Sequence, residues 1–178
     1  MNSDQLVIGI DPGLQGAIAV LRGGELVALH DMPLMPSDTE GKKVPDPLEV
    51  AKILRDVRDE AEADDRKVDL VVIELVNSMP RTCAKTGRKI KMGTASTFNF
   101  GLGVGMVEGA ARINKLAVTK SRAQVWKRRA RLINAKKDTA LERARQLWPE
   151  ADLRLKKHHG RAEALLIARY GHDLWPAA

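Results

Sequence analysis

The stretch that decides the fold is Leu6-Val7-Ile8-Gly9-Ile10-Asp11-Pro12-Gly13, followed closely by Gly16-Ala17-Ile18-Ala19-Val20-Leu21. Two apolar runs of this length around a Pro-Gly turn are typical of paired β-strands. A third run over 25–31 follows Arg22-Gly23-Gly24, which is also turn chemistry. The pattern predicts an antiparallel meander with strands over 5–11, 16–22 and 25–31, and it places Asp11 at the end of the first strand.

Helical and strand signals alternate after the meander. Asp46-Pro47 supplies an N-cap and a proline at the first helical position. Apolar residues recur at helical spacing to about Ala63, namely Leu48, Ala51, Leu54 or Val57, and Ala61. Residues 68–74 are apolar on both faces, as in a central strand. We also expect a strand over 115–118 and helices over 94–114, at 125–127, from a cap at Asp138 to Pro149, and from His159 or Gly160 to Gly171. The order predicts an α/β fold with a mixed sheet, an antiparallel meander plus parallel strands, and helices on both faces.

Two segments lack this periodicity. Residues 33–47 are linker-like, and 75–92 are predicted to form a polar, basic loop. In the helix over 94–114, the glycines Gly101, Gly105 and Gly109 form one stripe, which lets another backbone approach closely. We expect that partner to be the sheet of the same chain, with a second subunit as the alternative. Phe98 and Phe100 are expected in the core.

Size and composition limit the class of protein. A chain of 178 residues with 44% hydrophobic content predicts one domain spanning 1–178. The single cysteine, Cys83, lies among basic residues and has no spaced partner for a disulfide or zinc site, which favours a reducing cytoplasm. No apolar stretch approaches the roughly 20 residues of a membrane span, and no signal peptide is apparent at the N-terminus. We expect a soluble cytoplasmic protein without a membrane partner.

The positive charge is clustered. The net charge is +7, and residues 119–137 contain eight Lys or Arg residues and no Asp or Glu. Further basic groups lie in 81–91 and 154–157. Such clusters are typical of proteins that bind polyanions, because neutralising phosphates releases counterions. A solvated basic face is the alternative. The position of the clusters beside candidate acids favours nucleic acid.

Two acids end two core strands. Asp11 follows the first strand and Glu74 follows the strand over 68–74. Carboxylate oxygens are the ligands that hard divalent cations prefer, so the pair indicates a metal site. Taken separately, Asp11 can be a simple β-turn residue and Glu74 a salt-bridge partner of the basic loop.

Four segments together carry a family resemblance. They are Ile8-Gly9-Ile10-Asp11-Pro12-Gly13, Val72-Ile73-Glu74, Thr94-Ala95-Ser96-Thr97-Phe98-Asn99-Phe100-Gly101 and Gly160-Arg161-Ala162-Glu163-Ala164-Leu165-Leu166-Ile167-Ala168. In this order and spacing the chain resembles the RuvC-type Holliday junction resolvases, particularly their phage-borne relatives. The resemblance implies an RNase H-like fold, a homodimer in a bacterial or phage-infected cell, and cleavage of four-way and other branched DNA into paired nicks. It also implies two Mg²⁺ or Mn²⁺ ions per site and no small-molecule cofactor.

The resemblance also implies roles for particular residues. Asp11, Glu74 and Glu163 match metal ligands, and His159 stands near the place of a fourth. Lys127 and Lys137 match positions that contact DNA phosphate or aid catalysis, and Asn77, Ser78 and Met79 lie where relatives place junction-probing residues. The basic residues expected to bind DNA are Arg81, Lys85, Arg88, Lys89, Lys91, Lys127, Lys136 and Lys137. For Trp126, core packing is the expectation.

His159 departs from the commonest pattern of the family, which has an acid at the start of the last helix. This chain offers only His158-His159 there. Three interpretations stay open, because histidine carries protons and binds Mn²⁺ better than Mg²⁺. They are a working histidine, which we favour, a site that prefers Mn²⁺, and a weakened nuclease.

Two other functions compete with the nuclease. One is a branched-DNA-binding protein with weak or no cleavage. The other is a phosphotransferase of the actin and sugar-kinase type, whose first strands also read Ile-Gly-Ile-Asp followed by glycines. That architecture places its nucleotide between two such domains, and the chain has room for one.

Overall fold

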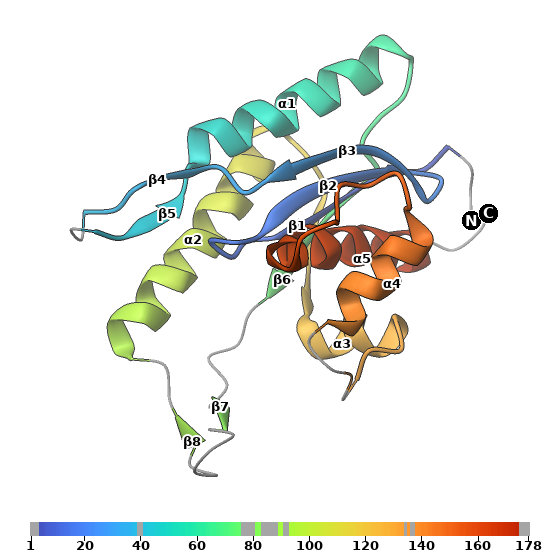
Figure 1. Cartoon of the computed structure of the whole chain (residues 1–178). Helices are drawn as coiled ribbons and strands as arrows, with labels where there is room; N and C mark the ends of the chain where they lie inside the picture. The colour runs from blue at the N-terminus through green and yellow to red at the C-terminus, as the bar shows by residue number, and fades with distance from the viewer. Residues whose placement is uncertain are drawn as a thin grey trace.

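A five-stranded mixed sheet lies at the centre of the molecule (Figure 1). The computed structural model describes residues 4–38, 41–75, 81–82, 89–90, 93–133, 135 and 138–174. The strand order is β3-β2-β1-β6-β9, with β1 Leu6–Asp11, β2 Ala17–Arg22, β3 Glu25–Asp31, β6 Leu70–Leu75 and β9 Val118–Arg122. The first three strands pair antiparallel, and β6 pairs parallel with both β1 and β9. The predicted meander and parallel central strand are confirmed.

Helices cover both faces of the sheet (Figure 1). On one face lie α1 Pro47–Ala63 and α2 Thr94–Ile113, and on the other lie α3 Ala123–Arg129, α4 Thr139–Leu147 and α5 His159–Leu174. Side chains of β1 alternate between two cores, since Ile8 packs in the core with Leu54 of α1, whereas Val7 packs with Leu165 of α5. None of the described helices has the length and apolar character needed to cross a bilayer.

The start of α1 follows its sequence signals. Asp46 Oδ1 accepts hydrogen bonds from the backbone N–H groups of Leu48 at 3.0 Å and Glu49 at 3.3 Å. The buried residues of α1 are Val50, Leu54 and Ala61. The expectation that Leu48 faces the core is wrong, because it lies two residues before Val50, on nearly the opposite side of the helix, and is 78% exposed.

Three segments differ from their predicted structure. The strand expected over 115–118 begins only at Val118, because Lys115 adopts a φ of 58° in the turn that follows α2. The linker-like stretch contains a hairpin, β4 Leu34–Pro36 with β5 Lys43–Pro45. The basic loop contains a second, β7 Arg81–Thr82 with β8 Lys89–Ile90. Strands of two or three residues are too short to produce a recognisable period.

The glycine stripe of α2 faces away from the sheet. A Cβ added at Gly101, Gly105 or Gly109 would meet nothing within 4 Å, so the expectation that the stripe packs on the chain's own sheet is wrong. Phe98 is 68% exposed on the same side of the helix, which also overturns its predicted core position. Close packing on the inner side of α2 instead involves Gly103, whose added Cβ would lie 3.1 Å from Pro45.

Candidate active site

Asp11 and Glu74 end neighbouring parallel strands. Ile10 of β1 is in register with Ile73 of β6, so the two acids follow at adjacent positions. Because side chains alternate along a strand, Asp11 shares the face of Val7, and Glu74 shares the face of Val72. Both valines pack in the core beneath α5. The two carboxylates therefore point to the α5 side of the sheet.

The helix α5 lies directly on these strands. A Cβ added to Gly9 of β1 would overlap the backbone of Ala164 and Ala168 in α5. At the start of the helix, a Cβ added to Gly160 would overlap the backbone carbonyl of Gln15, in the turn after β1. Only glycine permits such contacts. Because Gly9 and Gly160 lack side chains, α5 lies close to β1. This places Glu163, one helical turn after Gly160, toward the two strand acids.

A salt bridge also fixes the start of α5. The Arg161 guanidinium donates to both oxygens of Asp31 at the end of β3, at 2.6 and 2.8 Å, and to Oδ2 of Asp152 at 3.0 Å. Paired contacts of this kind define orientation as well as distance. The first turn of α5 is thus held by backbone contact on one side and by a bidentate ion pair on the other.

Burial and mutual repulsion perturb the strand acids. Burial is the main cause that raises the pKa of Asp11 to about 6, and the charge of Glu163 adds to it. The backbone N–H of Gly13 donates to Asp11 Oδ1 at 3.0 Å and opposes the rise. Burial likewise raises the pKa of Glu74 to about 7, with further contributions from Asp11 and Glu163. The three acids therefore act on one another electrostatically.

Two consecutive residues of α3 contact two of these acids. The indole N–H of Trp126, which is fully buried, donates to Glu74 Oε1 at 3.1 Å. The ammonium of Lys127 lies 2.7 Å from Glu163 Oε1 and 4.9 Å from the centroid of the Trp126 ring. Trp126 is in the core, as expected, but its hydrogen bond to Glu74 was not foreseen.

The two histidines contact different acids. His159 is the first residue of α5, and its Nε2 lies 3.5 Å from Oδ1 of Asp138. His158 is buried in a short 3₁₀ turn, with Nδ1 3.9 Å from Asp152 Oδ1. Asp138 occupies the N-cap position of α4, as predicted, but its side chain makes no capping hydrogen bond there. The backbone of Asp138 is helical, which is not the extended conformation of an N-cap.

The donor chemistry of the acids fits a divalent cation, because oxygen donors that repel one another are stabilised by a positive ion. Lys127 supplies part of that charge through its pair with Glu163. Within the described ranges, no three His, Cys, Asp or Glu side chains are close enough to hold an ion. Asp11, Glu74 and Glu163 therefore have the charge and the placement that a metal site needs, but their described side chains do not form a three-ligand cluster.

Several residues predicted to bind DNA lie outside the described residues. They are Asn77, Ser78, Met79, Lys85, Arg88, Lys91, Lys136 and Lys137. Arg81 begins β7 and Lys89 begins β8, and their side chains also lie outside the described part. Of the predicted DNA-binding set, Lys127 is the residue whose side chain the structure places, and it lies beside the acids.

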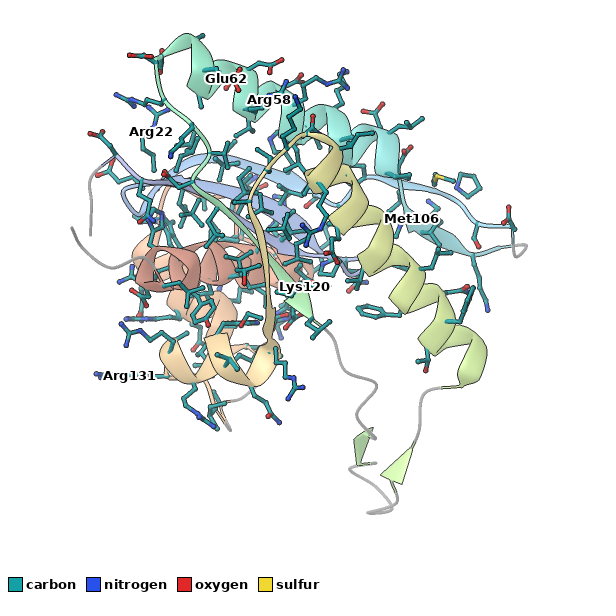
Figure 2. All side chains as sticks on the ribbon, turned by 180° about the vertical axis from the view of Figure 1, so that it is seen from behind. Arg22, Arg58, Glu62, Met106, Lys120 and Arg131 are labelled. Carbon is teal, nitrogen blue, oxygen red and sulfur yellow. The ribbon has the colours of Figure 1, made fainter. Side chains whose placement is uncertain are left out.

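Part of the basic cluster is neutralised within the chain. Lys120 of β9, labelled in Figure 2, pairs with Glu108 of α2 at 2.7 Å. Arg129 pairs with Asp173 at 2.8 Å. Arg122, Arg128 and Arg131 are exposed. The cluster therefore combines internal ion pairs with cations that face solvent.

Neither a family model nor a curated protein matches the sequence. The solved structures that match the fold include two that cover nearly the whole chain. A Thermus thermophilus RuvC in complex with a Holliday junction substrate is 15% identical with a TM-score of 0.57, covering 92% of this chain and 90% of that one. A structure of Thermus thermophilus RuvC alone is 16% identical with a TM-score of 0.52, covering 95% and 96%. The fold of this chain is therefore the RNase H-like fold of the RuvC Holliday junction resolvases, as the four sequence segments predicted.

Proposed function

We propose that the protein is a divalent-metal-dependent endonuclease that resolves four-way DNA junctions and other branched DNA by paired nicks. The observation that carries this proposal is that acids from three elements, placed on one face of the sheet, act on one another electrostatically. Asp11 and Glu74 end adjacent strands, and Glu163 raises the pKa of both from α5. Perturbed acids grouped in this way are typical of functional sites.

The acids hold the metal in the proposed reaction. Asp11, Glu74 and Glu163, with His159 at the start of α5, are the proposed metal ligands. Two Mg²⁺ or Mn²⁺ ions held there supply activation of water and stabilisation of the leaving oxygen. Lys127 balances the acids' negative charge and faces the incoming phosphate, and Lys137 is proposed to assist it.

Branched DNA is the proposed substrate because a solved structure with this fold is bound to a Holliday junction. The net charge of +7 and the exposed Arg122, Arg128 and Arg131 suit a polyanion. We place the protein in the cytoplasm of a bacterial or phage-infected cell, following the family resemblance.

A homodimer is proposed because symmetric nicks need two sites. The outer side of α2 offers an exposed apolar surface, which we call the α2 stripe and define as Phe98, Gly101, Leu102, Gly105, Gly109 and Ile113. Phe98, Leu102 and Ile113 are 68%, 42% and 77% exposed. The glycines leave room for a second backbone, since nothing lies within 4 Å of their added Cβ atoms. An exposed apolar helix face of this kind is typical of a subunit contact.

The proposal is tested by incubating the protein with a synthetic four-way junction, with Mg²⁺ and separately with Mn²⁺. We expect symmetric nicks in the junction and little cleavage of a linear duplex of the same sequence. Asp11→Asn is the control for contaminating nuclease. Absence of nicks with both ions, alongside specific binding of the junction, would reject the nuclease.

That outcome would support a second candidate, a junction-binding protein with little or no cleavage. His159 favours this candidate, because its nearest acid is Asp138 and the described side chains do not form a group of three potential ligands. The variant His159→Asp separates the two candidates. If the nuclease uses His159, the wild-type protein should cut the junction with Mn²⁺. If His159 has weakened the site, the wild type should bind without cutting, and His159→Asp should gain cleavage.

A further inference from the structure

A groove of about 550 Å³ opens beside Asp11. Three elements line it, namely the turn after β1, the β4–β5 hairpin and the N-terminal half of α2. Its volume is within the range of small-molecule sites. Pro12, which follows Asp11 in the sequence, forms part of its wall, so the groove lies at the end of β1 that carries Asp11, on the side covered by α2.

The walls of the groove combine apolar surface with a few polar groups. Phe100 of α2 and Leu34 of β4 contribute apolar surface, and both are partly exposed. Asn99 and Gln15, whose side chains carry amides, line the same groove. Groups of these two kinds match a nucleobase, which has an apolar face and a polar edge.

The lining of the groove also contains two cations. Lys42 and Lys43 of the β4–β5 hairpin line it, and both are exposed. Pro12, in another part of the lining, directly follows Asp11 in the sequence. DNA phosphates that contact the lysines would therefore lie on positive surface, in a groove whose lining also includes the residue after Asp11.

The groove is distinct from the α2 stripe. At 100° per residue, Asn99, Phe100 and Gly103 lie on the side of α2 that also carries the buried Val107. Phe98 and Leu102 lie on the other side of the helix. The centre of the α2 stripe and the groove therefore lie on different sides of α2.

We propose that this groove binds one unstacked nucleotide of the DNA substrate, adjacent to the phosphate that is cut. The base lies against Phe100 with its edge toward Asn99 and Gln15, and its neighbouring phosphates contact Lys42 and Lys43. This proposal rests on the proposed function, since it assigns part of the same substrate to a second surface. It accounts for the lysines and the amides by one ligand.

The test measures binding of a fluorescently labelled four-way junction in Ca²⁺, which supports binding without efficient cleavage. Lys42→Ala/Lys43→Ala should weaken binding by about tenfold or more at moderate salt and lower the salt slope by about two. Lys52→Ala/Arg55→Ala is the matched control, because it removes two exposed cations of α1 that do not line the groove. The control should bind nearly as wild type.

A second pair of variants tests the base. Phe100→Leu keeps an apolar wall but removes the ring, and should weaken binding by at least about fivefold. Asn99→Ala should weaken it without altering the salt slope, since it removes no charge. A 2-aminopurine placed at each nucleotide around the branch point should report an unstacked base at one position with wild-type protein, and the Phe100→Leu protein should change that signal. Thermal unfolding confirms that each variant is folded.

The outcomes separate this proposal from the proposed function. If the wild type neither binds nor cuts branched DNA, the proposed function fails and the groove proposal fails with it. If it binds and cuts, but the groove variants behave as the α1 control, only the groove proposal is overturned. It is equally overturned if the groove variants dissociate a dimer in sedimentation, because the groove would then be part of the subunit contact.

Discussion

Trp126 holds Glu74 through a single buried hydrogen bond, from the indole N–H to Oε1 at 3.1 Å, across two elements 52 residues apart in sequence. Glu74 is only 5% exposed, so water offers little replacement for this donor. We expect Trp126→Phe to lower metal-dependent cleavage by about tenfold to hundredfold, as is typical when the partner of a metal ligand is removed. Cleavage is measured as a function of Mn²⁺ concentration, and junction binding should be unchanged.

Trp148→Phe is the matched control for this change. Trp148 is also buried, and its indole N–H donates to the carbonyl of Gly24 at 2.9 Å. Each variant loses one indole hydrogen bond, which is buried at Trp126 and part-buried at Trp148, and each should lose about 1 kcal/mol of unfolding free energy. Equal loss of cleavage in both would show that Trp126 acts only through stability.

Neutralising the acids should separate binding from cleavage. Asp11→Asn, Glu74→Gln and Glu163→Gln each keep shape and remove a charge from the proposed ligand set. We expect nicking of a four-way junction to fall below detection in each variant, while binding in Ca²⁺ is retained. Near-normal cutting by one variant would exclude that residue as a ligand.

The metal-free protein should lose stability as its site acids ionise. The pKa of Asp11 is raised from 3.8 to about 6 and that of Glu74 from 4.5 to about 7, so the folded state binds their protons more tightly than the unfolded state. Their stabilising contribution is complete below about pH 4 and is lost as pH rises through about 6 to 7. In EDTA, the Tm of Asp11→Asn relative to wild type should therefore increase from about pH 4.5 to about pH 8.

A divalent ion should reverse this loss. Adding Mn²⁺ at about pH 8 should raise the Tm of the wild type, because an ion that binds only the folded state stabilises it. The Tm of Asp11→Asn should respond much less. An equal rise in both proteins would place the bound ion elsewhere.

Lys127 should contribute to DNA binding as well as to the charge balance of the site. Lys127→Ala should weaken junction binding and reduce the salt slope by up to about one. Lys120→Ala is the control, because Lys120 makes an ion pair of the same 2.7 Å length with Glu108 rather than with Glu163. Salt titration of binding compares the two. A slope that falls equally in both variants would contradict a specific phosphate contact at Lys127.

A charge in the α2 stripe should disrupt the homodimer. Leu102→Glu places a carboxylate at the centre of the stripe, where a symmetric contact would bring two such charges together. Sedimentation should detect a monomer, and paired nicking should become single nicking. Leu155→Glu is the control at another exposed leucine, which is 52% exposed. A wild type that is monomeric on the junction would rule out this assembly.

The parts of the fold that were predictable are those set by local chemistry. Asp46 and Pro47 start α1, and the turn after Asp11 ends β1, because capping and turn formation depend on neighbouring residues. The edge strand β9 was misplaced because its sequence is Val118-Thr119-Lys120-Ser121-Arg122, and this polar run has no strand period. The hairpin of β4 and β5 was not predicted because its strands are too short to show a period.

The candidate site divides in the same way. Asp11 and Glu74 were predictable because each follows an apolar strand, and register then places them side by side. The contact of Trp126 with Glu74 was not predictable, since a buried aromatic residue is consistent with simple packing. Such a hydrogen bond depends on how α3 is placed over the sheet, which no local pattern determines.

The backbone contact at Gly160 has a practical consequence for redesign. No side chain fits at residue 160, because the backbone there touches the turn after β1. We therefore expect α5, which carries Glu163, to keep its position on the strands when residue 159 is changed. The residue at position 159 can therefore be exchanged without moving the helix that carries it. In the proposed metal site, exchanging His159 for Asp, Asn or Glu should change the choice of ion while the spacing of the three acids stays as it is.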